Sequence, residues 1–225
     1  MEFHEWEPIY ERIRDDFGYD RRADASARDA LASFAEPFDL DRLAVRGRSV
    51  AIAGGAATLR DERGVAAETP HVFAASTATD VLDGAAIDVD VMVTDLDKNP
   101  ETAVRRTREG RPVAVHAHGD NVPQIRQYVP TFSDEHVLPT TQVEPRGPVE
   151  NFGGFTDGDR GAFLADEFGA AELLFPGWDF DDPSVGTAKR AKLEWAERLL
   201  YWLELRRDDR FDVLDGRRDA IELPF

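Results

Sequence analysis

Apolar segments of two kinds alternate along the chain from residue 48 onward, and this alternation constrains the fold more than any other feature. Short apolar stretches of strand length are separated by segments with the spacing of amphipathic helices. Strands that alternate with helices in this way are typical of a mostly parallel sheet flanked by helices. We therefore expect an α/β fold with strands at 49–53, 71–75, 90–94, 112–116, near 136–138 and at 171–175.

Helices are expected between and around these strands, at 76–82, 101–109, 122–128, 157–168 and 185–207. The stretch 130–150 is rich in proline and glycine and is expected to be mainly loop. Two further amphipathic helices precede the first strand, at 3–17 and 24–34, and the first has one apolar stripe from Phe3 to Phe17. We therefore predict an N-terminal helical segment over 1–45 and a catalytic α/β domain over 46–225.

The charge of the chain restricts its partners. The net charge is -18, which argues against a broad nucleic-acid-binding face. Only three basic residues are lysines, Lys98, Lys189 and Lys192, and all the others are arginine. An acidic, lysine-poor surface suits molar salt, where charges are screened beyond about 3 Å. We therefore expect a protein from a halophilic organism. Its three lysines either serve a function that arginine does not, which we favour for at least one of them, or are retained by chance.

Cysteine and long apolar runs are both missing. Without cysteine the chain forms neither a disulfide framework nor a thiolate zinc site. No apolar run approaches the ~20 residues of a membrane span, and the charged N-terminus lacks the apolar core of a secretion signal. We expect a cytoplasmic protein without membrane contact.

Polar clusters follow the strands at the points where they end. In open parallel sheets, ligands bind beyond the carboxyl ends of the strands. A cluster at one strand end arises easily by chance, but clusters at several ends favour a binding site. The clusters are Gly54-Gly55, Asp95 with Asp97, the His116–Asn121 segment, and Trp178-Asp179.

Asp95 and Asp97 are candidates for a metal site. Alternation along an extended chain places both carboxylates on one side, where they repel each other unless a cation lies between them. Mg²⁺ accepts one or two carboxylates together with phosphate oxygens. Lys98, directly after the pair, can neutralise phosphate charge. The alternative is a polar turn before the next helix, and the segment alone does not decide between the two.

The segment His116-Ala117-His118-Gly119-Asp120-Asn121 also has two interpretations. Its His-x-His-x-Asp pattern can bind zinc in hydrolases. It can equally form a turn that presents Asp120 and Asn121 to a ligand. A dinuclear hydrolase needs further ligands downstream, and His136 is the single histidine there, so we favour the second interpretation.

Two later segments can contact phosphate. In 151–160 (NFGGFTDGDR), glycines allow close approach of the backbone, Thr156 or Asp157 can cap a helix, and Arg160 can bind phosphate in a bidentate manner. An ordinary capped loop is the alternative. In 177–193, Trp178 can stack on a flat ring or belong to the core, and Lys189 and Lys192 can meet phosphate or only edge the helix.

Four motifs of the chain, in their order along the sequence, resemble those of the archaeal 6-hydroxymethyl-7,8-dihydropterin pyrophosphokinase family. The fold of that family is similar to the catalytic domain of thiamine pyrophosphokinase. The resemblance covers roughly residues 48–205. The motifs that carry it are VTDLD (93–97), HAHGDN (116–121), NFGGFTDGDR (151–160) and GWDF with its later lysines (177–193). HAHGDN and GGFTDGDR are the specific ones.

The resemblance implies Mg²⁺- and ATP-dependent transfer of diphosphate to the hydroxymethyl group of a reduced pterin, with release of AMP, in folate or methanopterin synthesis. It implies Asp95 and Asp97 as metal ligands, with catalytic roles for Asp120, Asp157 and Arg160. Related folds suggest a homodimer. The residues expected at the nucleotide and pterin are Gly54, Gly55, Lys98, His118, Asn121, Thr156, Asp159, Asp179, Lys189 and Lys192.

The chain departs from the family pattern at two turns. After the second strand it has Ala75-Ser76-Thr77-Ala78 in place of an Ala-Asp-Gly-Ala-like turn, so an aspartate of relatives is missing or relocated here. Gly54-Gly55-Ala56-Ala57 is a loose version of a Gly-x-Gly-Pro-Ser turn. Three alternatives stay open: a thiamine-type pyrophosphokinase, a metal-dependent hydrolase that uses HAHGD, and a non-catalytic nucleotide-binding module.

Overall fold

The computed structural model describes residues 1–225, and the chain divides into two compact units. The first unit combines residues 1–44 with 90–153, and the second combines residues 45–89 with 154–225. Each unit is therefore assembled from two stretches that are distant in the sequence. None of the helices is long and apolar enough to cross a lipid bilayer.

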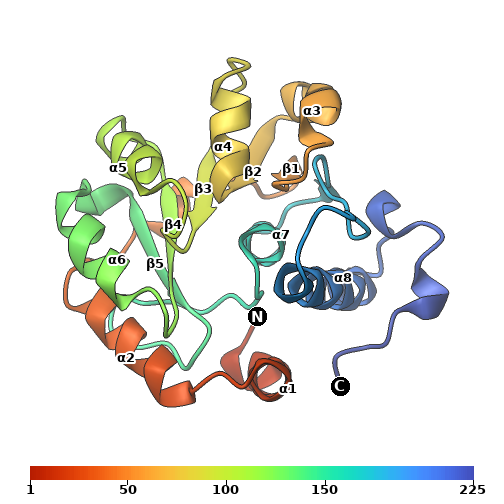
Figure 1. Ribbon diagram of the computed structural model, residues 1–225. Helices are drawn as coiled ribbons and strands as arrows, with labels where there is room; N and C mark the ends of the chain where they lie inside the picture. The colour runs from red at the N-terminus through yellow and green to blue at the C-terminus, as the bar shows by residue number, and fades with distance from the viewer. The chain divides into compact units, whose positions relative to one another are not determined.

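Three parallel strands form the centre of the first unit, in the order β5-β4-β3 (Figure 1). Every residue of these strands is buried, as expected for a parallel sheet with both faces covered. The elements of this unit are α1 (Phe3–Phe17), α2 (Arg21–Ala32), β3 (Val91–Thr94), α5 (Pro100–Arg108), β4 (Val113–Ala117), α6 (Val122–Tyr128) and β5 (Val137–Thr141).

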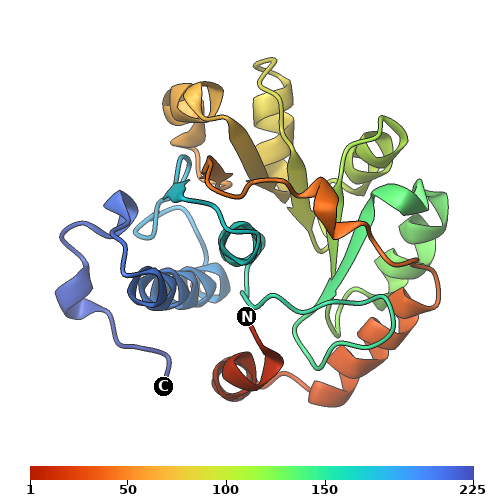
Figure 2. The same ribbon diagram turned by 180° about the vertical axis from the view of Figure 1, so that it is seen from behind.

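Helix α2 links the N-terminal segment to the strands of the first unit. It packs against α6, β4 and β5, and Leu31 joins Val115 and Ile125 in one apolar core. The segment after β5 runs beside α2 (Figure 2), where Arg28 Nη1 donates to the Glu144 carbonyl at 2.8 Å. Helix α2 is thus part of the first unit's core.

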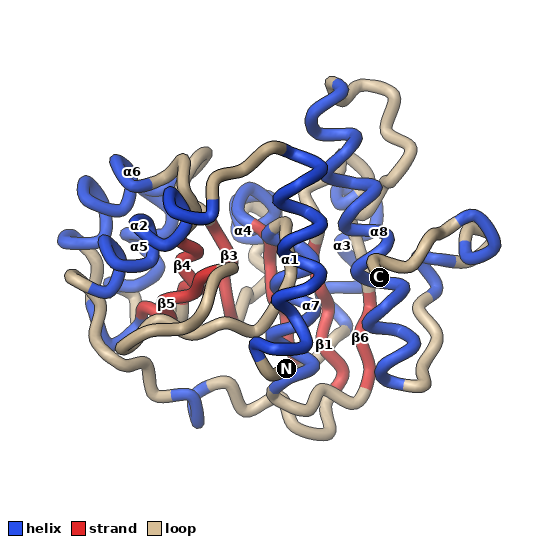
Figure 3. Tube along the Cα trace, turned by 90° about the horizontal axis from the view of Figure 1, so that it is seen from below, coloured by secondary structure: helices blue, strands red, loops and turns tan.

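The second unit also has three parallel strands, in the order β2-β1-β6. Helix α7 packs on β1 and β2 and contacts α8 (Figure 3). A separate apolar core contains Ala51, Leu59 and Leu82. The elements of this unit are β1 (Ser49–Ala53), α3 (Leu59–Glu68), β2 (His71–Ala75), α4 (Ser76–Asp83), α7 (Asp157–Glu167), β6 (Glu172–Leu174) and α8 (Thr187–Arg207).

Ion pairs hold the chain after α8. Arg217 pairs with Asp181 and Glu197, and Arg218 donates to Glu204 at 2.7 Å. The pKa of Asp181 is lowered, chiefly by its hydrogen bond from Arg217. Short 3-10 turns at Asp212–Leu214 and Arg218–Ala220 complete this segment.

The predicted α/β class, the parallel strands flanked by helices and the N-terminal helices are confirmed. Strands 49–53 and 71–75 have the predicted bounds. Helix α3 was not predicted, because its LRDERGVAAE sequence contains Gly64 and buries only Leu59 and Ala66. Strand β5 is longer than predicted and contains Pro139, which an edge strand tolerates because one of its sides needs no backbone donor.

Candidate active site

A strained turn follows β3 and carries the two candidate metal ligands. Leu96 has φ 67°, a left-handed conformation that costs a bulky residue about 1–3 kcal/mol. Its side chain is only 1% exposed and packs into the core of the first unit. Thr94 Oγ1 accepts from Leu96 N at 3.0 Å, and Asp95 Oδ1 accepts from Asp97 N at 3.2 Å. The turn therefore fixes the backbone that presents both carboxylates.

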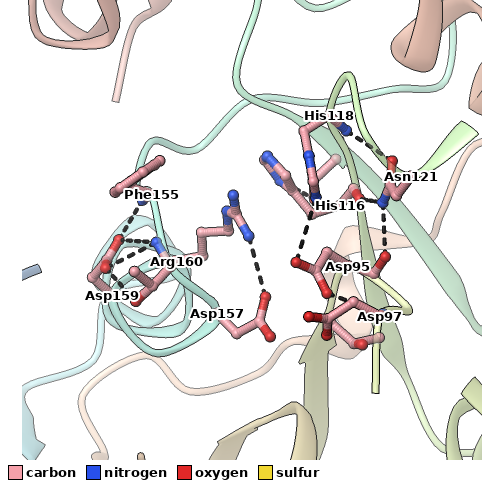
Figure 4. A network of polar contacts seen from close by, with 12 residues as sticks. Asp95, Asp97, His116, His118, Asn121, Phe155, Asp157, Asp159 and Arg160 are labelled. Carbon is pink, nitrogen blue, oxygen red and sulfur yellow. Dashed lines mark hydrogen bonds and ion pairs between the residues drawn. The ribbon is translucent and has the colours of Figure 1, made fainter. Parts of the chain in front are cut away.

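The HAHGDN segment meets this turn within the first unit. His118 Nε2 lies 3.4 Å from Asp95 Oδ2 (Figure 4). Asn121 Nδ2 donates to the carbonyl oxygens of Asp95 at 2.8 Å and His116 at 2.7 Å, and Asn121 Oδ1 accepts from His118 N at 3.0 Å. One amide side chain thus ties the ends of β3 and β4 together.

The structure distinguishes between residues of the HAHGDN segment and the acidic turn that were all predicted to contact a ligand. Asn121 is buried and uses its amide on the backbone, which gives it a positioning role, and its contact with a ligand stays a prediction. His116 is buried, with Nδ1 3.1 Å from Thr140 Oγ1 on β5. Asp97, Lys98 and Asp120 are exposed, and a ligand can reach their side chains.

The second unit contains a separate polar network at the start of α7. Asp159 is 0% exposed, and it accepts hydrogen bonds from Phe155 N, from Thr156 N at 3.0 Å and from Thr156 Oγ1 at 2.6 Å. Burial raises the pKa of this carboxyl, and the hydrogen bonds and the charge of Arg160 oppose that shift. Asp159 has no exposed surface, and its hydrogen bonds hold residues 155 and 156 on the helix. Its contact with a ligand stays a prediction.

Asp157 and Arg160 form an ion pair beside this network. Arg160 Nη1 lies 3.1 Å from Asp157 Oδ1, and Figure 4 shows the guanidinium directed at that carboxylate. Both side chains are largely buried, so the pair is screened less than a surface pair. A charged pair next to a helix N-terminus is suited to bind a phosphate or to orient a hydroxyl group.

A tight contact explains the first glycine of the Gly54-Gly55 turn. A Cβ at Gly54 would lie 2.4 Å from the Gly177 carbonyl oxygen and 2.9 Å from the Trp178 ring. The Trp178 indole donates from Nε1 to the Ile52 carbonyl at 2.8 Å. Trp178 is therefore anchored to β1, and packing accounts for Gly54, whereas Gly55 is exposed.

The turn that departs from the family pattern lies at the start of α4. Ser76 is buried and has φ 20°, an unusual value for a residue with a side chain. No carboxylate stands in the Ala75–Ala78 segment, so this strand end lacks an acidic group of its own.

The exposed Lys189 and Lys192 lie in the first turns of α8, and the half-buried Asp179 precedes this helix.

One residue of the first unit was missed by sequence reasoning. Asp24 on α2 is buried and accepts a hydrogen bond from Gly119 N in the HAHGDN segment at 2.7 Å. A signal was available, because Asp24 lies three residues before Ala27 and seven before Leu31, on the apolar face of the helix. A carboxylate on an apolar face indicates a buried hydrogen-bonding partner.

Comparison with known proteins agrees with the motifs. Residues 40–184 match the model of the family described as "6-hydroxymethylpterin diphosphokinase MptE-like". A 6-hydroxymethyl-7,8-dihydropterin pyrophosphokinase from Methanothermobacter thermautotrophicus is 38% identical over 94% of this chain and 99% of its own. Proteins of the same name from Pyrococcus furiosus and Methanocaldococcus jannaschii are 37% and 32% identical, each over 91% of this chain and at least 95% of their own. The chain therefore belongs to the MptE-like 6-hydroxymethylpterin diphosphokinase family.

Proposed function

We propose that this protein transfers diphosphate from ATP to 6-hydroxymethyl-7,8-dihydropterin, giving AMP and the pterin diphosphate. The observation that carries the proposal is the match to the family and to three pyrophosphokinases over nearly the whole chain. The strained turn with Asp95 and Asp97 supports it, because this reaction needs a cation on the polyphosphate.

The acidic turn fits Mg²⁺. Mg²⁺ is a hard cation that usually takes one or two carboxylates and fills its other positions with water and phosphate oxygens. Asp95 and Asp97 supply two carboxylates, and no cluster of three or more acidic or histidine side chains suggests a cage for a different metal. When bound, Mg²⁺ would neutralise charge on the phosphate oxygens. His118, 3.4 Å from Asp95, would hold that carboxylate in place.

The chemical step requires positioning more than covalent help. The hydroxymethyl oxygen bonds to the β-phosphorus, the bond from that phosphorus to the α,β-bridging oxygen breaks, and AMP departs with the oxygen. The hydroxyl proton passes to a carboxylate or to water. We assign orientation of the hydroxyl to Asp120 or Asp157, and assign charge neutralisation on the phosphates to Arg160 and the exposed lysines.

A labelling experiment tests the proposal. The purified chain is incubated with ATP labelled at the β-phosphorus, Mg²⁺ and the reduced pterin in molar potassium chloride, which suits its acidic surface. We expect one AMP for each labelled pterin diphosphate. Production of ADP, or no nucleotide product, would overturn the proposal. If the label passes to thiamine in preference to the pterin, the protein is a thiamine-type pyrophosphokinase. If it turns over a substrate in the absence of any nucleotide, it is a hydrolase.

Matched variants connect the activity to the acidic turn. Asp95→Asn removes one metal ligand, and Asp134→Asn removes an exposed charge elsewhere in the first unit. We expect loss of turnover in the first variant alone. The homodimer, the cytoplasmic location, the halophilic source and the 1–45/46–225 domain division stay predictions, and light scattering in molar salt tests the first of them.

A further inference from the structure

The N-terminal helices contact the HAHGDN turn through one buried carboxylate. Asp24 is 3% exposed, and its Oδ1 accepts from Gly119 N at 2.7 Å. Its Oδ2 accepts from Tyr10 Oη at 2.7 Å and from Gln142 Nε2 at 2.8 Å. A single side chain therefore joins α1, α2, the turn after β4 and the segment after β5.

The hydrogen bonds around Asp24 are strong ones. A carboxylate acceptor makes shorter and stronger hydrogen bonds than a neutral group, and burial strengthens them further. Burial and the bond to Asp24 raise the pKa of the Tyr10 phenol, which therefore stays a donor. Trp6 Nε1 donates to the Gln142 carbonyl at 2.9 Å and holds the same segment from α1.

The turn also lies directly on the surface of α2. A Cβ at Gly119 would stand 2.7 Å from Ala23 Cβ and 3.4 Å from Asp24 Oδ1. Real Cβ atoms do not approach as closely as 2.7 Å, so a side chain at 119 would lift the turn away from the helix. Gly119 does not have a positive φ, so its close packing against α2 explains why this position is a glycine.

The position of this turn determines the geometry at the acidic turn. His118, next to Gly119, places its Nε2 3.4 Å from Asp95 Oδ2, and Asn121 binds the Asp95 carbonyl. A shift of Gly119 would move both contacts. We propose that Asp24 is a positioning residue, which sets the location of His118 and hence the orientation of the Asp95 carboxylate. As a statement about catalysis, this rests on the proposed function.

Through Asp24, helices α1 and α2 contribute to the geometry of the candidate active site. They precede residue 40, where the match to the family model begins. Asp24 makes a polar contact with the turn, and the other buried side chains of α2, Ala27 and Leu31, are apolar. We infer that these helices provide the surface on which the turn at Gly119 packs.

Two pairs of variants test the proposal. Asp24→Asn keeps the size of the side chain but replaces one acceptor oxygen by an amide group, which cannot accept from Gly119 N or from Gln142 Nε2. Tyr10→Phe is its control, because it removes a bond to Asp24 without changing the bond to Gly119. Gly119→Ala creates the contact with Ala23. Adding Ala23→Gly removes that contact, although the substitution at Gly119 is still present.

In the diphosphokinase assay, we expect Asp24→Asn and Gly119→Ala to lower kcat by about 10–100-fold, the effect of small misplacement of reacting groups. The KM for ATP should change less. Tyr10→Phe should retain activity, and Ala23→Gly should restore most of the turnover of Gly119→Ala. Unchanged kcat in Asp24→Asn, or no restoration by Ala23→Gly, would overturn the proposal.

A second measurement is independent of the reaction. Amide hydrogen exchange of the free protein reports directly on Gly119 N–H, and we expect lost protection of the 117–122 peptide in Asp24→Asn but not in Tyr10→Phe. If the wild-type chain proves inactive on the pterin while this pattern holds, the proposed function fails and the positioning role stands. Equal protection in both variants refutes the positioning role whatever the activity.

Discussion

Replacing Asp159 with alanine should destabilise the protein by about 2–4 kcal/mol. The change removes an acceptor that binds Phe155 N, Thr156 N and Thr156 Oγ1 at the start of α7. Phe155 is buried, and an unpaired buried N–H costs about 1–3 kcal/mol. Loss of a helix cap adds about 1 kcal/mol, and the half-buried Thr156 regains part of its bonding from water.

Chemical denaturation in high salt measures this change, with Glu167→Ala on the exposed side of the same helix as the control. The control should stay within about 0.5 kcal/mol of the wild type. In a chain of this size, the expected loss corresponds to roughly 4–16 °C in Tm. A loss below about 1 kcal/mol in Asp159→Ala would show that the loop does not depend on this carboxylate.

The pH dependence of Asp159→Asn provides a second test at the same position. Burial raises the pKa of Asp159 above its ordinary value of 3.8, so the folded protein binds the proton more tightly than the unfolded chain. Stability from this shift is therefore fully present below pH 3.8 and is lost as pH rises through the folded pKa. The wild type should gain stability relative to Asp159→Asn on acidification. An opposite slope would contradict the stated effect of burial.

Three further predictions follow from the acidic turn, the lysines and the C-terminal segment. Asp95→Asn should weaken Mg²⁺ binding in calorimetry and lower turnover by at least about 100-fold, because even outer partners of metal ligands are worth 10–100-fold. Arginine in place of all three lysines should raise the KM for ATP, and an unchanged KM would mean that their retention has no role in binding. Because Arg217 lowers the pKa of Asp181, stability from their pair should be present above pH 3.8 and lost as pH falls through the lowered pKa, so Arg217→Ala should flatten the acid limb of a Tm profile.

Much of the fold could be predicted because apolar strands and amphipathic helices differ in spacing along the chain. The prediction failed where spacing carries little information. Helix α3 buries only two side chains, and β5 continues through a proline that most strands exclude. The ends of β1, β2 and β3 lie where they were predicted.

The candidate site was harder to predict, because a polar residue in a loop can serve a ligand or the loop itself. Asn121 and Asp159 were assigned to ligands, and the structure shows that both also hydrogen-bond to residues of their own unit. Asp24 was overlooked because its partner Gly119 lies 95 residues away in the sequence. Spacing identifies clusters that are local in the chain, and it does not reveal where their hydrogen bonds end.

The assembly of each unit from two distant stretches has a consequence for synthesis on the ribosome. Residues 1–44 complete their unit only with residues 90–153, so they wait for roughly 110 further residues. At about 5–20 residues per second, that delay is roughly 5–20 s. During this time Trp6, whose indole later binds the Gln142 carbonyl, lacks its partner. Residues 1–44 are therefore a segment in which protection by a chaperone would matter during synthesis.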